Sequence, residues 1–120
     1  VKIESLSNYC NANGIDHINY LKIDVQGYEQ PVIEGCQPLL QKGAIDVIEV
    51  ELIVARVYEK RTSFYDLEKG LIENGYRLIA LSNDGRFYNF DPFDLLANKE
   101  LQLDLIYVNH RTLVAIMDSG

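Results

Sequence analysis

The sequence predicts one structural unit of the α/β class, in which helices alternate with the strands of a single sheet. Two β-rich runs, residues 18–25 and 45–54, are each followed by a segment with apolar residues at helical spacing. Glycines stand where several of these segments end. A chain of 120 residues is long enough for one hydrophobic core and too short for two full domains.

Composition narrows the possible partners. Hydrophobic residues make up 48% of the chain and charged residues 24%, which is ordinary for soluble proteins, and no apolar run reaches the roughly 20 residues that cross a bilayer. The net charge of −7 repels nucleic acid and anionic lipid. We therefore expect a cytoplasmic protein with no nucleic-acid or membrane partner. Cys10 and Cys36 lack metal-site spacing and are expected to be buried free thiols, with a disulfide as the alternative.

The first helix and the first strand are expected near the amino end. Ser5 or Ser7 is placed to cap a short helix that Gly14 ends. Residues 18–25 alternate only loosely and are rich in Ile, Leu and Val, a pattern typical of a strand buried on both faces of a parallel sheet.

A second helical segment is expected over residues 28–42, ending at Gly43. Pro38 falls inside it and should kink the helix or divide it into two. Residues 45–54 are the strongest strand signal in the chain because they are dense in β-branched side chains.

The third helix is expected between a cap at Thr62 or Ser63 and an end at Gly75, with Asp66 in its first turns. Its predicted apolar face comprises Phe64, Leu67, Leu71 and Ile72.

The remaining residues predict two strands and their connection. Residues 76–81 form a strand, and the Asp84-Gly85 pair indicates a hairpin over 76–90. Residues 91–100 are expected to be a loop or short helix. Residues 103–109 form the final strand, and the tail beyond them is expected to be poorly ordered.

Acidic residues at strand ends are the candidate functional groups. Asp24 ends the first strand and Glu29 begins the following helix. Such residues either line the carboxyl edge of the sheet, where α/β proteins bind ligands, or merely stabilise the helix start by about 0.3–1 kcal/mol, and the residues alone favour neither interpretation. Glu49 and Glu51 share one face of their strand. Glu51 is nearer the carboxyl end of the strand. For both glutamates, an ion pair with a Lys or Arg, such as Arg56, is the alternative to a functional role.

Several stretches resemble a known family. They read "YLKIDVQGYEQPVIEGCQPLLQKGAIDVIEVEL", "LIENGYRLIAL" and "LDLIYVN". They are similar to the C-terminal half of the FkbM family of S-adenosylmethionine-dependent methyltransferases, in which L-K-[IL]-D-[VI]-[EQ]-G-x-E precedes V-[LI]-x-G. The resemblance runs from about Ser5 to Asn109.

The resemblance implies a three-layer, Rossmann-like class I methyltransferase fold. That fold has a seven-stranded, mostly parallel sheet with a reversed last strand, and residues 1–120 would be its C-terminal portion, strands four to seven. The cofactor lies over the first two strands, with a glycine-rich loop and a ribose-binding acid. This chain lacks that combination, so we expect that the N-terminal cofactor half is absent and that these residues alone bind cofactor poorly and are inactive.

The resemblance also implies roles for individual residues. The reaction would be methyl transfer from S-adenosylmethionine to a hydroxyl of a sugar or other small metabolite. Asp24 and Glu29 would be catalytic, with Asp24 nearest the transferred methyl. Asp24 and Gln26 would contact the cofactor, and Tyr28 and Glu51 the substrate. Gln26 replaces the Glu of many relatives, and we predict no metal ion.

Two other interpretations compete with an enzyme. A half-domain would expose the edge of the strand at residues 18–25, and the chain would then be a non-catalytic interaction or oligomerisation module. It would form a homodimer or pair with a separate N-terminal half. Less favoured is an unrelated α/β protein, such as a nucleotide-binding regulator.

Overall fold

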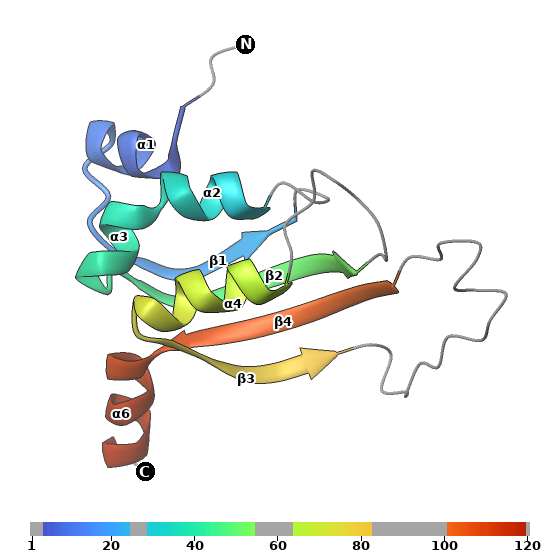
Figure 1. Ribbon diagram of the computed structural model, residues 1–120. Helices are drawn as coiled ribbons and strands as arrows, with labels where there is room; N and C mark the ends of the chain where they lie inside the picture. The colour runs from blue at the N-terminus through green and yellow to red at the C-terminus, as the bar shows by residue number, and fades with distance from the viewer. Residues whose placement is uncertain (1–3, 25–28, 55–63, 83–100, 120) are drawn as a thin grey trace, which may run out of the picture.

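The described residues form one mixed four-stranded sheet with helices packed on it (Figure 1). The computed structural model describes residues 4–24, 29–54, 64–82 and 101–119. In chain order the elements are α1 (Leu6–Ala12), β1 (Ile18–Ile23), α2 (Glu29–Gly35), α3 (Gln37–Lys42), β2 (Ile45–Val54), α4 (Phe64–Glu73), β3 (Tyr76–Ser82), β4 (Leu101–Asn109) and α6 (His110–Ser119).

The strand order is β1-β2-β4-β3. β1 pairs in parallel with β2, whereas β4 is antiparallel to both β2 and β3. The prediction of a reversed last strand is therefore confirmed. The prediction of a mostly parallel sheet is wrong, because the reversed strand lies between two others and makes two of the three described strand pairs antiparallel.

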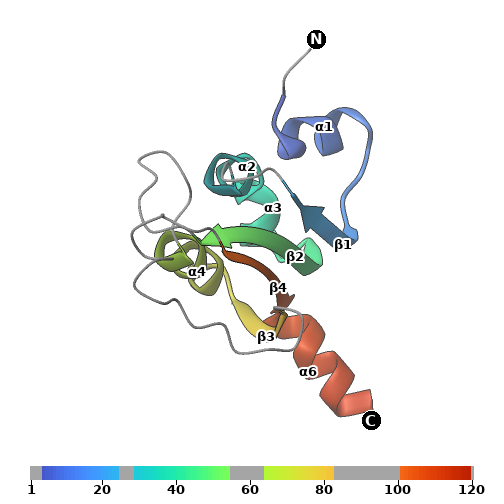
Figure 2. The same ribbon diagram turned by 90° about the vertical axis from the view of Figure 1, so that its right-hand side faces the viewer.

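Helices cover one face of the sheet. Figure 2 shows α2, α3 and α4 on the same side of the strands. α1 packs against α2 and α3, and α6 continues from the end of β4 and contacts that strand. A helical layer on the opposite face is not among the described residues, so the three-layer arrangement stays a prediction.

The core lies between this helical layer and the sheet. Along β2, Ile48, Val50 and Leu52 are at most 1% exposed and alternate with half-buried residues. On β4, the fully buried Tyr107 and Leu105 stand directly opposite Ile48 and Val50. The intervening β2 residues, Glu49 and Glu51 among them, therefore point to the other face. Removing these side chains from water is the main stabilising contribution to the fold.

β1 departs from its prediction. It was expected to be buried on both faces, but Tyr20 is 52% exposed whereas Ile23 is 2% exposed. β1 is an edge strand of the described sheet, and the helices cover only one of its faces. The apolar residues of β1 therefore did not predict which of its side chains are buried.

Pro38 divides the second helical segment, as predicted. α2 ends at Gly35 and α3 begins at Gln37, so Pro38 lies in the first turn of the new helix. A proline is tolerated there because the first-turn N–H groups have no acceptor within the helix. Gly43 then ends α3 with a left-handed φ of 67°.

The ends of the other helices follow local sequence signals. The hydroxyl of Ser5 accepts a hydrogen bond of 3.1 Å from the backbone N–H of Asn8, which confirms it as the cap of α1. In α4, Leu67 and Leu71 are fully buried, but Phe64 and Ile72 are 41% and 42% exposed, so its buried face is narrower than predicted. The predicted caps Thr62 and Ser63, the hairpin turn at Asp84-Gly85 and the connection at 91–100 lie outside the described residues.

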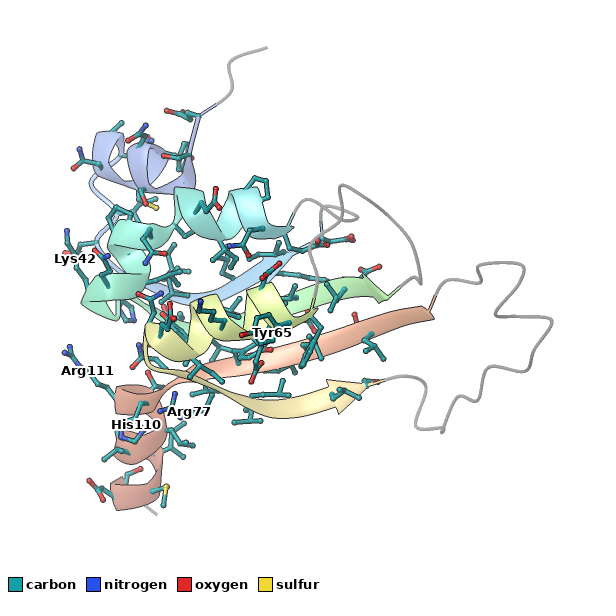
Figure 3. All side chains as sticks on the ribbon, in the orientation of Figure 1. Lys42, Tyr65, Arg77, His110 and Arg111 are labelled. Atoms are coloured by element: carbon teal, nitrogen blue, oxygen red, sulfur yellow. The ribbon has the colours of Figure 1, made fainter. Side chains whose placement is uncertain are left out.

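The chain after β4 is helical, so the prediction of a poorly ordered tail is wrong. The side-chain oxygen of Asn109 accepts a 2.9 Å hydrogen bond from the N–H of Arg111, which satisfies a donor of the first turn of α6. The Thr112 hydroxyl donates to Asp46 of β2 at 2.9 Å. Figure 3 shows His110 and Arg111 where α6 leaves the sheet. No helix in the described ranges is both long and apolar enough to span a membrane.

Replacing Gly43 with alanine should destabilise the protein more than replacing Gly14. Both glycines have φ of 67°, where a Cβ is strained by about 1–2 kcal/mol. A Cβ at Gly43 would also lie 3.2 Å from Nδ2 of the buried Asn109, whereas one at Gly14 meets nothing within 4 Å. We expect Gly14→Ala to lower the free energy of unfolding by about 1 kcal/mol and Gly43→Ala by about 2 kcal/mol, measured by urea denaturation. Equal losses would show that Asn109 moves aside without cost.

Candidate functional site

Three carboxylates form a row across neighbouring strands at the carboxyl ends of β1 and β2. The register places Ile23 of β1 beside Val50 of β2, so the next residues, Asp24 and Glu51, are level with each other. Glu51 is in turn directly opposite Asp104 of β4. We call Asp24, Glu51 and Asp104 the acidic row. Because β1 and β2 are parallel, their carboxyl ends open at one edge of the sheet, which is where α/β proteins bind ligands.

Glu51 is the electrostatically perturbed member of the acidic row. Its pKa is raised above the usual range, first because partial burial desolvates its carboxylate, and then because the charge of Asp24 and a hydrogen bond with it favour a bound proton. The charge of Asp104 acts in the same direction, and Lys22 opposes it. A hydrogen bond between two carboxyl groups requires a proton on one of them. The level placement of Asp24 and Glu51 on neighbouring strands is therefore one reason for the raised pKa of Glu51.

Glu49, two residues earlier on the same face, has a different environment. Its Oε2 lies 3.7 Å from Nζ of Lys22 on β1. The pKa of the Tyr20 phenol is raised by desolvation and by interaction with this carboxylate. Glu49 therefore forms an ion pair, which was the predicted alternative to a functional role. Its partner is Lys22, whereas Arg56 was the partner suggested from the sequence. Arg56 lies outside the described residues.

Of the other predicted site residues, Glu29 is the one that the structure describes. Glu29 opens α2 and is fully buried, in contact with neighbouring groups. Gln26 and Tyr28 fall between β1 and α2, outside the described residues. The structure thus places Asp24 beside Glu51, and the roles given to all five residues stay predictions.

Asp104 is a member of the row that sequence reasoning missed. It lies in a strand that alternates apolar and polar side chains, so the sequence alone predicts only that its side chain faces solvent. Only the pairing of β4 with β2, about fifty residues apart in the chain, brings it opposite Glu51. Its signal was an acid within an apolar strand, the same signal that drew attention to Glu51.

A comparison with family models assigns this chain to a known group. The model described as the methyltransferase FkbM domain matches residues 1–78 of the 120. This chain belongs to the FkbM methyltransferase family. No curated protein and no solved structure matches it.

The matched residues of this FkbM methyltransferase chain run from α1 to the first residues of β3 and include Asp24 and Glu51. Asp104 and α6 lie beyond the match. In the described part of the chain, no cluster of three or more His, Cys, Asp or Glu is arranged to hold a metal ion.

Replacing Glu51 with glutamine should stabilise the FkbM chain at neutral pH. A carboxyl whose pKa is raised by folding binds more protons in the folded state, so its contribution to stability is fully present below its unfolded pKa and is lost as the pH rises through the folded value. Glutamine does not ionise and avoids this loss. We expect Glu51→Gln to unfold at a higher urea concentration than the parent at pH 7, with the difference shrinking toward pH 4.

Glu73→Gln, on the exposed side of α4, is the control and should show no such pH-dependent difference. A Glu51→Gln variant that is less stable than the parent at pH 7 would contradict the prediction.

Proposed function

We propose that this chain is the C-terminal part of an S-adenosylmethionine-dependent methyltransferase that methylates a hydroxyl of a sugar or other small metabolite. The supporting observation is that the carboxyl groups of Asp24 and Glu51 lie level with each other at the carboxyl ends of two parallel strands, within the segment that matches the family model. A carboxyl pair at such an edge is suited to orienting a hydroxyl and taking its proton.

The described residues fit only part of the cofactor. S-adenosylmethionine carries a positive sulfonium and ribose hydroxyls, both of which suit the carboxylates of the acidic row. Nucleotides also need a close backbone approach at a glycine between a strand and a helix. The described glycines lie within helices or after them: Gly14, Gly35, Gly43, Gly70 and Gly75. Gly27 follows β1 but is outside the described residues. We infer that much of the cofactor's binding surface comes from elsewhere.

Positioning is the main contribution we assign to the chain. The cofactor supplies an electrophilic methyl group, and transfer requires the acceptor oxygen to lie in line behind it. Orientation of this kind lowers a barrier by up to roughly 7–11 kcal/mol. Asp24 is exposed and accepts a hydrogen bond from the acceptor hydroxyl, then its proton. Glu51 lies level with Asp24 on the neighbouring strand and positions its carboxylate.

The proposal is tested by assaying the protein translated from the entire reading frame that contains these 120 residues. It is incubated with S-adenosylmethionine labelled in its methyl group and with a panel of sugars and small alcohols. We expect label in an acceptor as a base-stable ether. Label only in amines, or no transfer with any acceptor, would overturn the assignment to hydroxyl methylation.

The alternative role, an interaction module, is favoured by the position of β1 at the edge of the described sheet. An edge strand presents backbone groups on which another strand can pair. Analytical ultracentrifugation of the 120-residue chain separates the two ideas. A stable dimer that binds no labelled cofactor and adds no activity to the full protein would favour the module, whereas a monomer would remove the support for it.

A further inference from the structure

A cavity separate from the acidic row lies between α1 and α3. Its volume is about 430 Å³, within the range of small-molecule pockets. The lining residues come from α1, the connection to β1, and α3: Ser7, Asn8, Cys10, Asn11, Ile15, Asp16, Pro38, Leu39 and Lys42. Figure 3 labels Lys42 at the end of the protein away from the strand arrowheads of β1 and β2.

The cavity does not belong to the candidate active site. Asp16 precedes the start of β1 and Lys42 precedes the start of β2, so the cavity lies at the amino ends of these parallel strands. The acidic row lies at their carboxyl ends. The six residues of β1 separate the two ends by roughly 20 Å.

The inner wall of the cavity is apolar. Cys10 and Leu39 are 1% and 8% exposed and belong to the hydrophobic core, and Pro38 adds a rigid ring beside them. Ile15 on the rim is 38% exposed. An apolar group that entered here would lose contact with water on several sides, which favours its binding.

Polar groups surround this apolar wall, and some of them lack partners. The hydroxyl oxygen of Ser7 is buried and has no hydrogen-bond partner in the described structure. Buried polar atoms are seldom left this way in folded proteins, but this oxygen has no surface exposed to the cavity, so we assign it no ligand contact. The side-chain amides of Asn8 and Asn11 stand next to it on α1 and offer both donors and acceptors.

One negative and one positive side chain complete the cavity. Asp16 and Lys42 are both exposed, and within the described ranges neither forms an ion pair with any residue, including the other. The ammonium group of Lys42 therefore suits a carboxylate, and the carboxylate of Asp16 suits an ammonium. A ligand that carries only one charge would leave one of the two unmatched.

We propose that this cavity binds a free α-amino acid with an apolar side chain. The amino acid's ammonium pairs with Asp16, its carboxylate pairs with Lys42, and its side chain rests on Cys10 and Leu39. This site is independent of the proposed methyl transfer, because its residues lie at the opposite end of the sheet.

The test is a titration of the 120-residue chain with leucine, followed by the backbone NMR shifts. We expect saturable shifts confined to α1, the connection to β1, and α3. N-acetyl-leucine lacks the ammonium and leucinamide lacks the carboxylate, and each should bind about tenfold more weakly, since a charge-assisted hydrogen bond is lost. Glycine, which lacks the apolar side chain, should also bind more weakly.

Substitutions of the charged lining residues test whether leucine binds in this cavity. Lys42→Met and Asp16→Asn should each weaken leucine binding about tenfold, whereas Lys69→Met and Asp118→Asn, exposed charges on α4 and α6 that do not line the cavity, should leave it unchanged. Thermal melts by circular dichroism establish that the variants are folded. The proposal is overturned if leucine produces no saturable shifts, if the two blocked compounds bind as well as leucine, or if the control variants weaken binding equally. Failure of methyl transfer in the assay above would not affect any of these results.

Discussion

Replacing Asp24 with asparagine is expected to lower kcat for methyl transfer by about 10²–10⁴ while changing KM little. Asparagine has nearly the same shape and still accepts a hydrogen bond, so the acceptor hydroxyl is still bound. It is uncharged and takes up no proton, and proton acceptance by a positioned side chain contributes a factor of this size. The variant also removes the negative charge that raises the pKa of Glu51. Initial rates with labelled cofactor and the full protein give both constants.

The matched control for Asp24→Asn is Glu49→Gln. Glu49 lies on the same face of the sheet, two residues before Glu51, and its charge is already matched by Lys22. Loss of such a solvent-accessible ion pair costs at most about 1 kcal/mol, so kcat should change by less than about fivefold. If the two variants lose similar activity, the negative potential of the whole face is responsible. The specific role of Asp24 would then be wrong.

The sequence predicted those elements whose signals are local. The β-branched run of β2 was placed at Ile45–Val54, the bounds that the structure has. Pro38 divides α2 from α3, and Ser5 caps α1, because each acts on backbone groups within one turn of itself. No distant contact is needed to predict any of these features.

Features that depend on distant contacts were predicted less well. β4 was predicted as a strand and as reversed, but its residues do not predict that it lies between β2 and β3. The exposure of Tyr20 follows from the edge position of β1, and α6 depends partly on the contact of Thr112 with Asp46, 66 positions away. The alternation of apolar and polar residues along a strand predicts which face each side chain lies on. It does not predict which strands lie beside it.

The candidate site shows the same division. The strand-end position of Asp24 and the shared face of Glu49 and Glu51 follow from the periodicity of strands. The difference between the two glutamates does not, because it depends on which residues of β1 and β4 are level with each of them. Lys22 is beside Glu49, whereas Asp24 and Asp104 flank Glu51. Register therefore makes one glutamate an ion-pair partner and raises the pKa of the other.

The largest effect on stability is expected at Leu71, a side chain that α4 contributes to the hydrophobic core. Its side chain is fully buried, and α4 contributes only one other fully buried residue, Leu67. Shortening such a leucine to alanine removes apolar surface from the core and leaves a cavity, at a cost of about 2–5 kcal/mol. Proteins of this size have about 5–15 kcal/mol of stability in total. Leu71→Ala should therefore remove a large share of it, measured by urea denaturation.

The neighbouring position provides the control for Leu71→Ala. Ile72 is on the same helix, has a side chain of the same size and is 42% exposed. Alanine has the higher helix propensity, which offsets part of the apolar contact that Ile72→Ala loses, so we expect a change below about 1 kcal/mol. Similar losses at both positions would mean that the outer side of α4 is also covered in solution. The helix would then have a second partner there, and the single helix-on-sheet core would not account for its stability.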